Sequence, residues 1–220
     1  MGRDLDKERF TEAEYARFGE RLREQLGVLR DLLATPGFGQ GPVTIGAELE
    51  LFLVDGRGRP LPRNSEVRDA LGDPRVVLEL GRYNLEVNLT PIPLEGEPFK
   101  AMSAEVQETI TKVDKAVAAL DRPAEGGGAL PIGILPTLGT EHFTVGDMSD
   151  QNRYRAMSRG IRRLRLEPFL VRIEDLELSV EDVILEAANT SWQVHVRTPP
   201  DRFARLFNAA QLAIGPVLAA

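Results

Sequence analysis

Acidic residues stand two positions apart in the stretch VTIGAELELFLVD, residues 43–55. Strict alternation of apolar and polar residues is typical of a strand, because strand side chains have a period of two. Glu48 and Glu50 therefore share one face, roughly 7 Å apart along the chain. The opposite face is a row of aliphatic side chains that must be buried. Two carboxylates on the front of such a strand predict a metal site.

Two further stretches, residues 81–91 and 189–198, repeat this design. Several carboxylates on one sheet face would repel each other unless cations or solvent separated them. Bound metal ions would remove that repulsion and would also gather the phosphates of a nucleotide. Carboxylates with one imidazole and no lysine suit hard divalent ions such as Mg²⁺ or Mn²⁺. The polar positions added by the two stretches are Glu86 and Asn88 in the first, and Gln193 and His195 in the second.

A simpler interpretation stays open for these strands. Half-buried antiparallel sheets normally have a solvated polar face. A typical solvated face mixes Lys, Arg, Thr and Glu, and the three stretches together lack that mixture. The sequence therefore leaves two alternatives, a metal site and a plain structural sheet with a solvated acidic front.

A basic helix is expected over residues 150–165, with Ser149 as its cap and six arginines along it. The planar guanidinium of arginine donates paired hydrogen bonds to a carboxylate or a phosphate. Arg153 and Arg155 are therefore candidates for binding a substrate or nucleotide. The alternative is a solvated face paired with acids elsewhere. It holds for most of these arginines, because six of them on one short helix cannot all face a substrate.

Composition excludes several classes of protein. The net charge of −7 argues against a generic nucleic-acid binder, and no apolar run approaches the ~18 residues of a membrane span. The N-terminus is charged and lacks the apolar region of a secretory signal. The chain has no cysteine, which excludes disulfides and thiolate metal sites and fits a reducing cytoplasm. We therefore expect a cytoplasmic protein.

The remaining elements form one expected domain, residues 1–220, with an N-terminal helix over 11–36 and a sheet-and-helix body over 40–220. The chain stops inside an apolar helical pattern, so we expect this domain to be truncated at its C-terminal end. Thr11 and Glu14 form a capping box for the first helix. Other expectations are an irregular segment over 60–75, a helix over 97–120 with Phe99 in its buried stripe, a flexible loop over 121–128, a strand over 130–138, a strand or hairpin over 169–178 and a helix from about 201.

Four stretches resemble the glutamate–cysteine ligase family. IGAELELFLVD resembles its Gly-x-Glu-x-Glu first strand, and LELGRYNLEVNLTP resembles its second acidic strand. Residues 152–157, NRYRAM, resemble its Arg-Tyr-x-x-Met region. Residues 191–196, SWQVHV, resemble the strand that ends in a Gln-x-His pair. The order of these motifs matches over roughly residues 40–220.

This resemblance implies an α+β fold, with a curved, mainly antiparallel sheet and flanking helices, similar to the catalytic domain of glutamine synthetase. It implies a reaction in which ATP phosphorylates a substrate carboxylate and an amine then forms an amide bond. Family members are longer, so the chain resembles the N-terminal part. Expected partners are small amino acids, with either a second copy of the chain or a missing C-terminal segment. The main alternative is a non-catalytic binding or assembly module of the same fold, completed by another chain.

The resemblance also implies roles for individual residues. Arg153 would bind a substrate carboxylate or phosphate, and Gln193 and Arg155 would contact substrate or nucleotide. Asn88 is not assigned a role, because the alignment of this strand with the family motif can shift by two residues. Such a shift would exchange the acidic and amide positions. The implied ligands of Mg²⁺ or Mn²⁺ are Glu48, Glu50, Glu86 and, for the nucleotide-side metal, His195.

Overall fold

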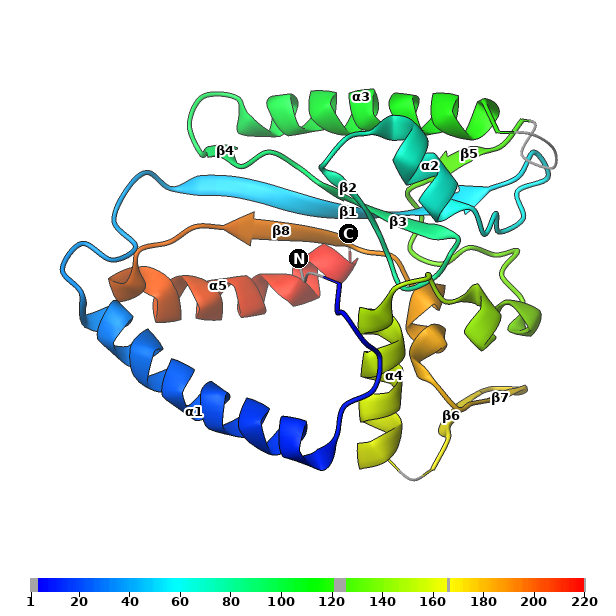
Figure 1. Ribbon diagram of the computed structural model, residues 1–220. Helices are drawn as coiled ribbons and strands as arrows, with labels where there is room; N and C mark the ends of the chain where they lie inside the picture. The colour runs from blue at the N-terminus through cyan, green and yellow to red at the C-terminus, as the bar shows by residue number, and fades with distance from the viewer. Residues whose placement is uncertain (1–3, 121–125, 166, 220) are drawn as a thin grey trace. The chain divides into compact units, whose positions relative to one another are not determined.

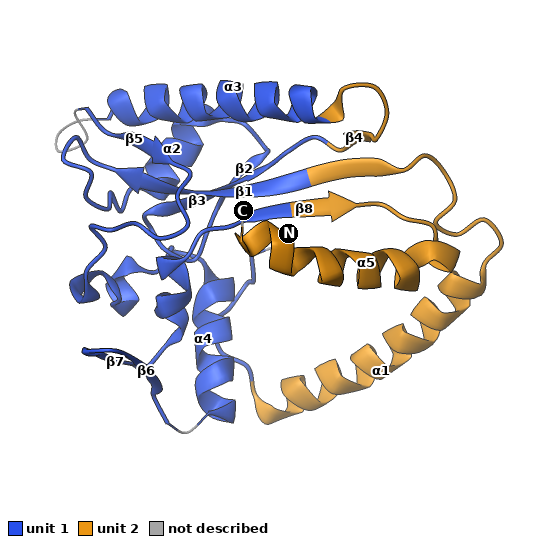
Figure 2. Cartoon of the chain, turned by 180° about the vertical axis from the view of Figure 1, so that it is seen from behind, with its two compact units in different colours: residues 1–10, 47–90, 99–193 blue, residues 11–46, 91–98, 194–220 orange. Residues whose placement is uncertain are grey.

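A computed structural model describes residues 4–120, 126–165 and 167–219 (Figure 1). The chain divides into two compact units (Figure 2). Unit 1 comprises residues 1–10, 47–90 and 99–193, and unit 2 comprises residues 11–46, 91–98 and 194–220. The single domain over 1–220 stays a prediction. The predicted loop 121–128 lies largely outside the described residues.

The sheet of unit 1 is antiparallel, and its register places the predicted acidic positions together. Glu50 lies opposite Glu86, and Glu48 lies opposite Asn88. Directly opposed residues of an antiparallel pair point to the same face, so the two strands share one acidic front. Helices together with this antiparallel sheet confirm the α+β class. The strands are β1 (Thr44–Val54), β2 (Val76–Leu78), β3 (Asn84–Asn88) and β5 (Gly128–Leu130), with β2 pairing β3 and both β3 and β5 pairing β1.

The apolar back of β1 and β3 is buried, as the alternation predicts, whereas that of the third stretch is exposed, with Trp192 at 45% and Val194 at 52%. Leu51, Leu85 and Val87 are fully buried. In Figure 1, α2 (Asn64–Leu71) and α3 (Pro98–Ala118) lie on one side of the strands. The prediction for Phe99 is wrong, because this side chain is 68% exposed while Met102, Val113 and Val117 are buried on α3.

Two other predictions about unit 1 are wrong. Helix α2 lies in the segment predicted to be irregular, and Gly72 ends it in the left-handed conformation that suits glycine. The segment 131–138 contains no strand beyond the end of β5 at Leu130. Pro131 and Pro136 lack the N–H that a sheet ladder needs, which explains why the strand stops there.

A second core lies on the acidic side of the sheet. Phe52 and Tyr83 pack there with Tyr154 and Ile184. Ser149 does not cap the basic helix, because Gln151 is the N-cap residue and the Ser149 hydroxyl donates to the Glu79 carbonyl. The elements on this side are η1 (Thr140–His142), η2 (Val145–Asp147), α4 (Asn152–Leu164), η3 (Val183–Ala188) and the confirmed hairpin of β6 (Phe169–Ile173) and β7 (Leu176–Val180).

Unit 2 contains α1 (Glu12–Ala34), β4 (Ile92–Pro93) and α5 (Pro200–Ala219), with the start of β1 and the end of β8 (Trp192–Val196). The Thr11–Glu14 capping box is present. Neither α1 nor α5 has a buried residue in the described ranges, although both carry apolar stripes. Phe18 is 65% exposed and Phe207 is 52% exposed. No helix in these ranges is long and apolar enough to cross a membrane.

Candidate active site

The centre of the site is a pair of carboxylates on adjacent strands of unit 1. Glu86 is only 7% exposed, and its Oε1 accepts a hydrogen bond from Nδ2 of Asn88 at 2.8 Å. Glu50 is half-buried and accepts from the Ser191 N–H at 2.8 Å and from Nε2 of Gln193 at 3.2 Å. Gln193 therefore lies beside Glu50, a predicted metal ligand.

Glu79 is a third carboxylate at this site, and sequence reasoning missed it. It follows β2 directly, and its side chain lies within hydrogen-bonding reach of Glu86. Burial raises the pKa of Glu79 to about 7, although the Leu80 N–H donates to its carboxylate, and the charges of Glu86 and Glu50 raise it further. We call Glu50, Glu79 and Glu86 the acidic face. Within the described ranges, the hydrogen bonds from other residues to these carboxylates come from neutral donors.

A cavity of about 270 Å³ opens beside the acidic face. Two of the three carboxylates line it, and Glu186 of η3 adds another from a different element. Among the described residues, the rest of the lining is neutral and contains no Lys, Arg or His. The lining residues are Glu50, Glu79, Leu80, Asn84, Glu186, Ala187, Asn189, Thr190, Ser191 and Gln193.

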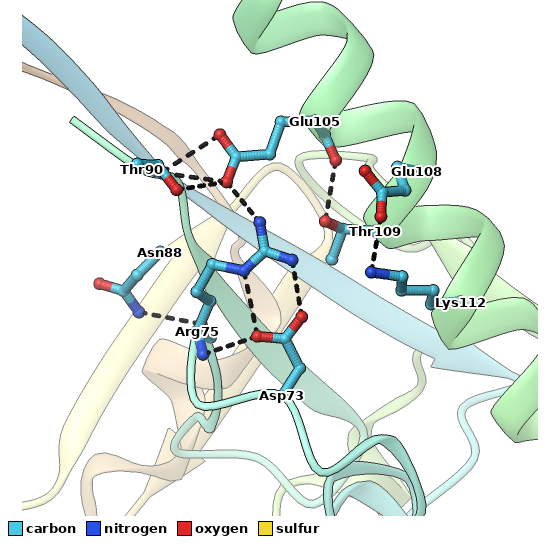
Figure 3. A network of polar contacts seen from close by, with 8 residues as sticks. All are labelled: Asp73, Arg75, Asn88, Thr90, Glu105, Glu108, Thr109 and Lys112. Carbon is cyan, nitrogen blue, oxygen red and sulfur yellow. Dashed lines mark hydrogen bonds and ion pairs between the residues drawn. The ribbon is translucent and has the colours of Figure 1, made fainter. Parts of the chain in front are cut away.

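A network of ion pairs holds the edge strand and the end of β3 (Figure 3). Arg75 contacts Asp73 at 2.6 Å and Glu105 of α3 at 2.5 Å, and we call these three residues the Arg75 cluster. Glu105 also accepts from the N–H of Thr90 at 3.1 Å. The hydrogen bonds from Arg75 lower the pKa of Asp73 to about 2. Nδ2 of Asn88 donates to Glu86 and also to the Arg75 carbonyl at 3.4 Å. Asn88 therefore links the Arg75 cluster to the acidic face.

The two predicted arginines differ in their surroundings. The guanidinium of Arg153 donates to the Leu78 carbonyl at 3.0 Å, next to Glu79 in the chain, and lies over the Tyr154 ring at 4.4 Å. Arg155 instead forms ion pairs with Glu8 at 2.9 Å and with Asp150 at 2.6 Å. Arg153 is thus the arginine beside the acidic face, whereas Arg155 and Arg159 hold Glu8 of the N-terminal segment, at 2.9 Å in each case.

The sequence matches glutamate-cysteine ligase family 2 over residues 44–220, which is most of the chain. The chain belongs to this family. No curated protein and no solved structure matches it. Membership confirms the predicted resemblance and implies a ligase in general terms.

The remaining predicted ligands of this glutamate–cysteine ligase relative are Glu48 and His195. Glu48 is half-buried in unit 1, opposite Asn88. His195 belongs to unit 2, where it lines a cavity of about 420 Å³ with Thr44, Pro91 and Arg197. In the ranges that the structure describes, no group of three or more His, Asp or Glu side chains is arranged as a metal site. The site assignments from sequence therefore stay predictions.

Proposed function

We propose that the chain is an ATP-dependent carboxylate–amine ligase, which forms a γ-glutamyl-type amide through an acyl phosphate. Family membership supports the ligase class. The observation that carries the proposal is the acidic face: three carboxylates of unit 1 lie close together beside a cavity and accept hydrogen bonds from neutral donors. Such a cluster requires protons or cations to balance its charge.

We assign Mg²⁺ or Mn²⁺ as that cation. The donor types fit, because hard divalent ions prefer carboxylate oxygens. Glu48, Glu50 and Glu86 would hold the metal, with His195 on the nucleotide side, and Glu79 is a further candidate from the structure. A bound metal would offset the phosphate charge during phosphoryl transfer. The neutral donors Asn88, Ser191 and Gln193 would keep the carboxylates oriented toward it.

The basic and amide groups would bind the organic substrates. Arg153 donates to the carbonyl of Leu78, the residue before Glu79, and would hold a carboxylate or phosphate, because a guanidinium matches either group. Gln193 would help to orient the substrate beside Glu50, and Arg155 would contact the nucleotide after releasing Glu8. We expect amino acids as substrates and a cytoplasmic location.

Assembly is a second candidate function, and unit 2 favours it. The apolar stripes of α1 and α5 are exposed, including Leu22, Leu26, Phe203 and Phe207. A binding module of the same fold, completed by a second copy or another chain, would cover such stripes. Metal and nucleotide binding separates this candidate from the ligase.

The decisive experiment is calorimetric titration of the full chain with Mg²⁺ and a non-hydrolysable ATP analogue. It is paired with an assay of ADP release from ATP, glutamate and a panel of amino acids. The ligase proposal predicts saturable Mg²⁺-dependent nucleotide binding, lost in Glu50→Gln and kept in Glu108→Gln. Glu108 is the matched control, because it is an exposed acid on α3 paired with Lys112. Absence of binding by the wild-type chain would overturn the proposal and favour the assembly module.

A further inference from the structure

The connection between β2 and β3, residues 79–83, begins with Glu79 and leads to Glu86 on β3. Two buried residues lie against its main chain, Asn64 at 1% and Ser149 at 0% exposed. They come from separate segments, because Asn64 is the first residue of α2 and Ser149 precedes α4. Neither of them is among the described residues that line the cavity beside the acidic face. Their contacts with the protein therefore have to explain why two polar side chains are buried here.

Each main-chain carbonyl from residue 79 to residue 82 accepts a hydrogen bond from one of these two residues. The Ser149 hydroxyl donates to the Glu79 carbonyl, and the Ser149 N–H donates to the next carbonyl at 2.8 Å. Nδ2 and the N–H of Asn64 donate to the carbonyls at positions 81 and 82, at 3.0 and 2.9 Å. Nδ2 of Asn64 also donates to the Ser149 hydroxyl at 2.8 Å, which joins the two sets of bonds into one network.

This network acts against electrostatic repulsion. Val77 lies opposite Glu86, so Glu79, two residues further on, is a diagonal neighbour of Glu86 on the same face. The two side chains lie within hydrogen-bonding reach, although carboxylates at that distance repel each other. A connection without outside support would relieve the repulsion by turning Glu79 away. The network resists that movement, because it would leave a buried hydroxyl and a buried amide unsatisfied.

We propose that Asn64 and Ser149 are positioning residues, which hold the main chain at Glu79 so that its carboxylate stays beside Glu86 in the absence of a cation. For Mg²⁺ binding, the inference rests on the proposed ligase function. There it predicts tighter binding, because a carboxylate that is already in place does not have to be ordered when the ion arrives. Both residues act through Glu79, and neither contacts the ion.

The first test is a double-mutant cycle on stability, measured in chelator at pH 8. Glu86→Gln removes the repulsion and should raise the melting temperature by roughly 2–4 °C. Ser149→Ala removes the hydroxyl that holds the Glu79 carbonyl and should lower the melting temperature. In the double variant the gain from Glu86→Gln should fall to less than half, because Glu79 is already free to move away. Additive shifts would give Ser149 a purely structural role and overturn the inference.

Further variants in the same cycle control for the loss of a buried hydrogen bond. Thr109 is 1% exposed, and its hydroxyl donates to the Glu105 carbonyl at 2.8 Å within α3. In Thr109→Val the full gain from Glu86→Gln should persist. Ser149→Thr keeps the hydroxyl and should retain most of that gain, whereas Asn64→Leu should reduce it as Ser149→Ala does. If Ser149→Ala does not fold, Ser149→Cys replaces it, because a thiol fills similar space with a weaker donor.

The second test is calorimetric titration of the full chain with Mg²⁺. Ser149→Ala should weaken Mg²⁺ binding about tenfold, as expected for a residue that orients a ligand, whereas Thr109→Val should stay within twofold of wild type. In a Glu79→Gln background, Ser149→Ala should cause no further loss, because it acts through that carboxylate. The same tenfold loss in that background would show that Ser149 does not act through Glu79, and would refute the inference.

The two tests distinguish failure of this inference from failure of the ligase proposal. A wild-type chain that binds neither Mg²⁺ nor nucleotide, but shows non-additive melting temperatures, would refute the ligase and leave the positioning role of Asn64 and Ser149 standing. Normal Mg²⁺ and nucleotide binding with additive melting temperatures would do the reverse.

Discussion

The acidic face and the Arg75 cluster lie in the same unit and are balanced in opposite ways. In the Arg75 cluster each carboxylate has a guanidinium partner, and those hydrogen bonds lower the pKa of Asp73 to about 2. On the acidic face the carboxylates accept from neutral donors, and burial with mutual repulsion raises the pKa of Glu79 to about 7. The first cluster is complete as it stands, whereas the second requires a proton or cation from outside.

This difference assigns the two regions different roles: the Arg75 cluster stabilises the sheet, and the acidic face is available for binding. Arg75 ties the segment before β2 to α3, and the same segment contacts Asn88 on β3. The Arg75 cluster therefore holds strands whose acidic face has carboxylates without a cationic partner. Removing a charge should have opposite effects on stability in the two places, and the following variants test that contrast.

The largest effect is expected for Glu86→Gln, which removes a buried carboxylate from the acidic face without changing its shape. Mg²⁺ affinity should fall at least ~100-fold, because a proposed metal ligand is lost. The free chain should become more stable by about 1 kcal/mol in chelator, because repulsion with Glu79 disappears. Calorimetry and urea unfolding measure the two quantities. A loss of stability together with unchanged Mg²⁺ binding would remove the distinction between the clusters.

Arg75→Met should have the opposite effect on stability. It leaves Asp73 and Glu105 without their guanidinium, and both carboxylates are largely shielded from solvent, at 15% and 16% exposed. We expect a loss of about 2–3 kcal/mol in the free energy of unfolding, below the value for a fully buried pair. Arg59→Met is the control, because its pair with Asp55 is 58% exposed on the arginine side and should cost under ~1 kcal/mol. Equal losses in both variants would contradict the structural role of the cluster.

The pH dependence of stability sharpens the same contrast at Glu79. Its folded pKa of about 7 exceeds the ordinary value of 4.5, so its stabilising contribution is complete below pH 4.5 and disappears as pH rises through 7. Glu79→Gln keeps the neutral form at every pH. In chelator the variant should match wild type at pH 4 and exceed its free energy of unfolding by about 1–2 kcal/mol at pH 8. Parallel curves for the two proteins across this range would show that Glu79 titrates normally.

Local alternation explains which parts of this contrast could be predicted from sequence. The period of two on β1 and β3 placed Glu50 and Glu86 on one face, and the register confirms it. Glu79 was missed because β2 spans three residues, too few to show a period.

Pairings between distant segments carry no local signal. Glu105 lies thirty residues from Arg75, and Asp4 contacts the Arg153 N–H from 149 residues away. The basic helix was correctly placed as an element, but its arginines could not be sorted by sequence. Only the structure shows that Arg155 and Arg159 bind Glu8 while Arg153 reaches the end of β2.

The smallest expected effect is at Asn88, which connects the two clusters. Its Nδ2 donates to Glu86 at 2.8 Å and reaches the Arg75 carbonyl at 3.4 Å. Asn88→Ala should reduce Mg²⁺ affinity about five- to tenfold by releasing Glu86, because residues that orient a ligand contribute less than the ligand itself. The free energy of unfolding should change by only about 1 kcal/mol. In the Arg75→Met background the effect on Mg²⁺ should shrink, because the strand that positions Asn88 is already loosened. Full additivity of the two changes in a double-mutant cycle would show that the clusters act independently.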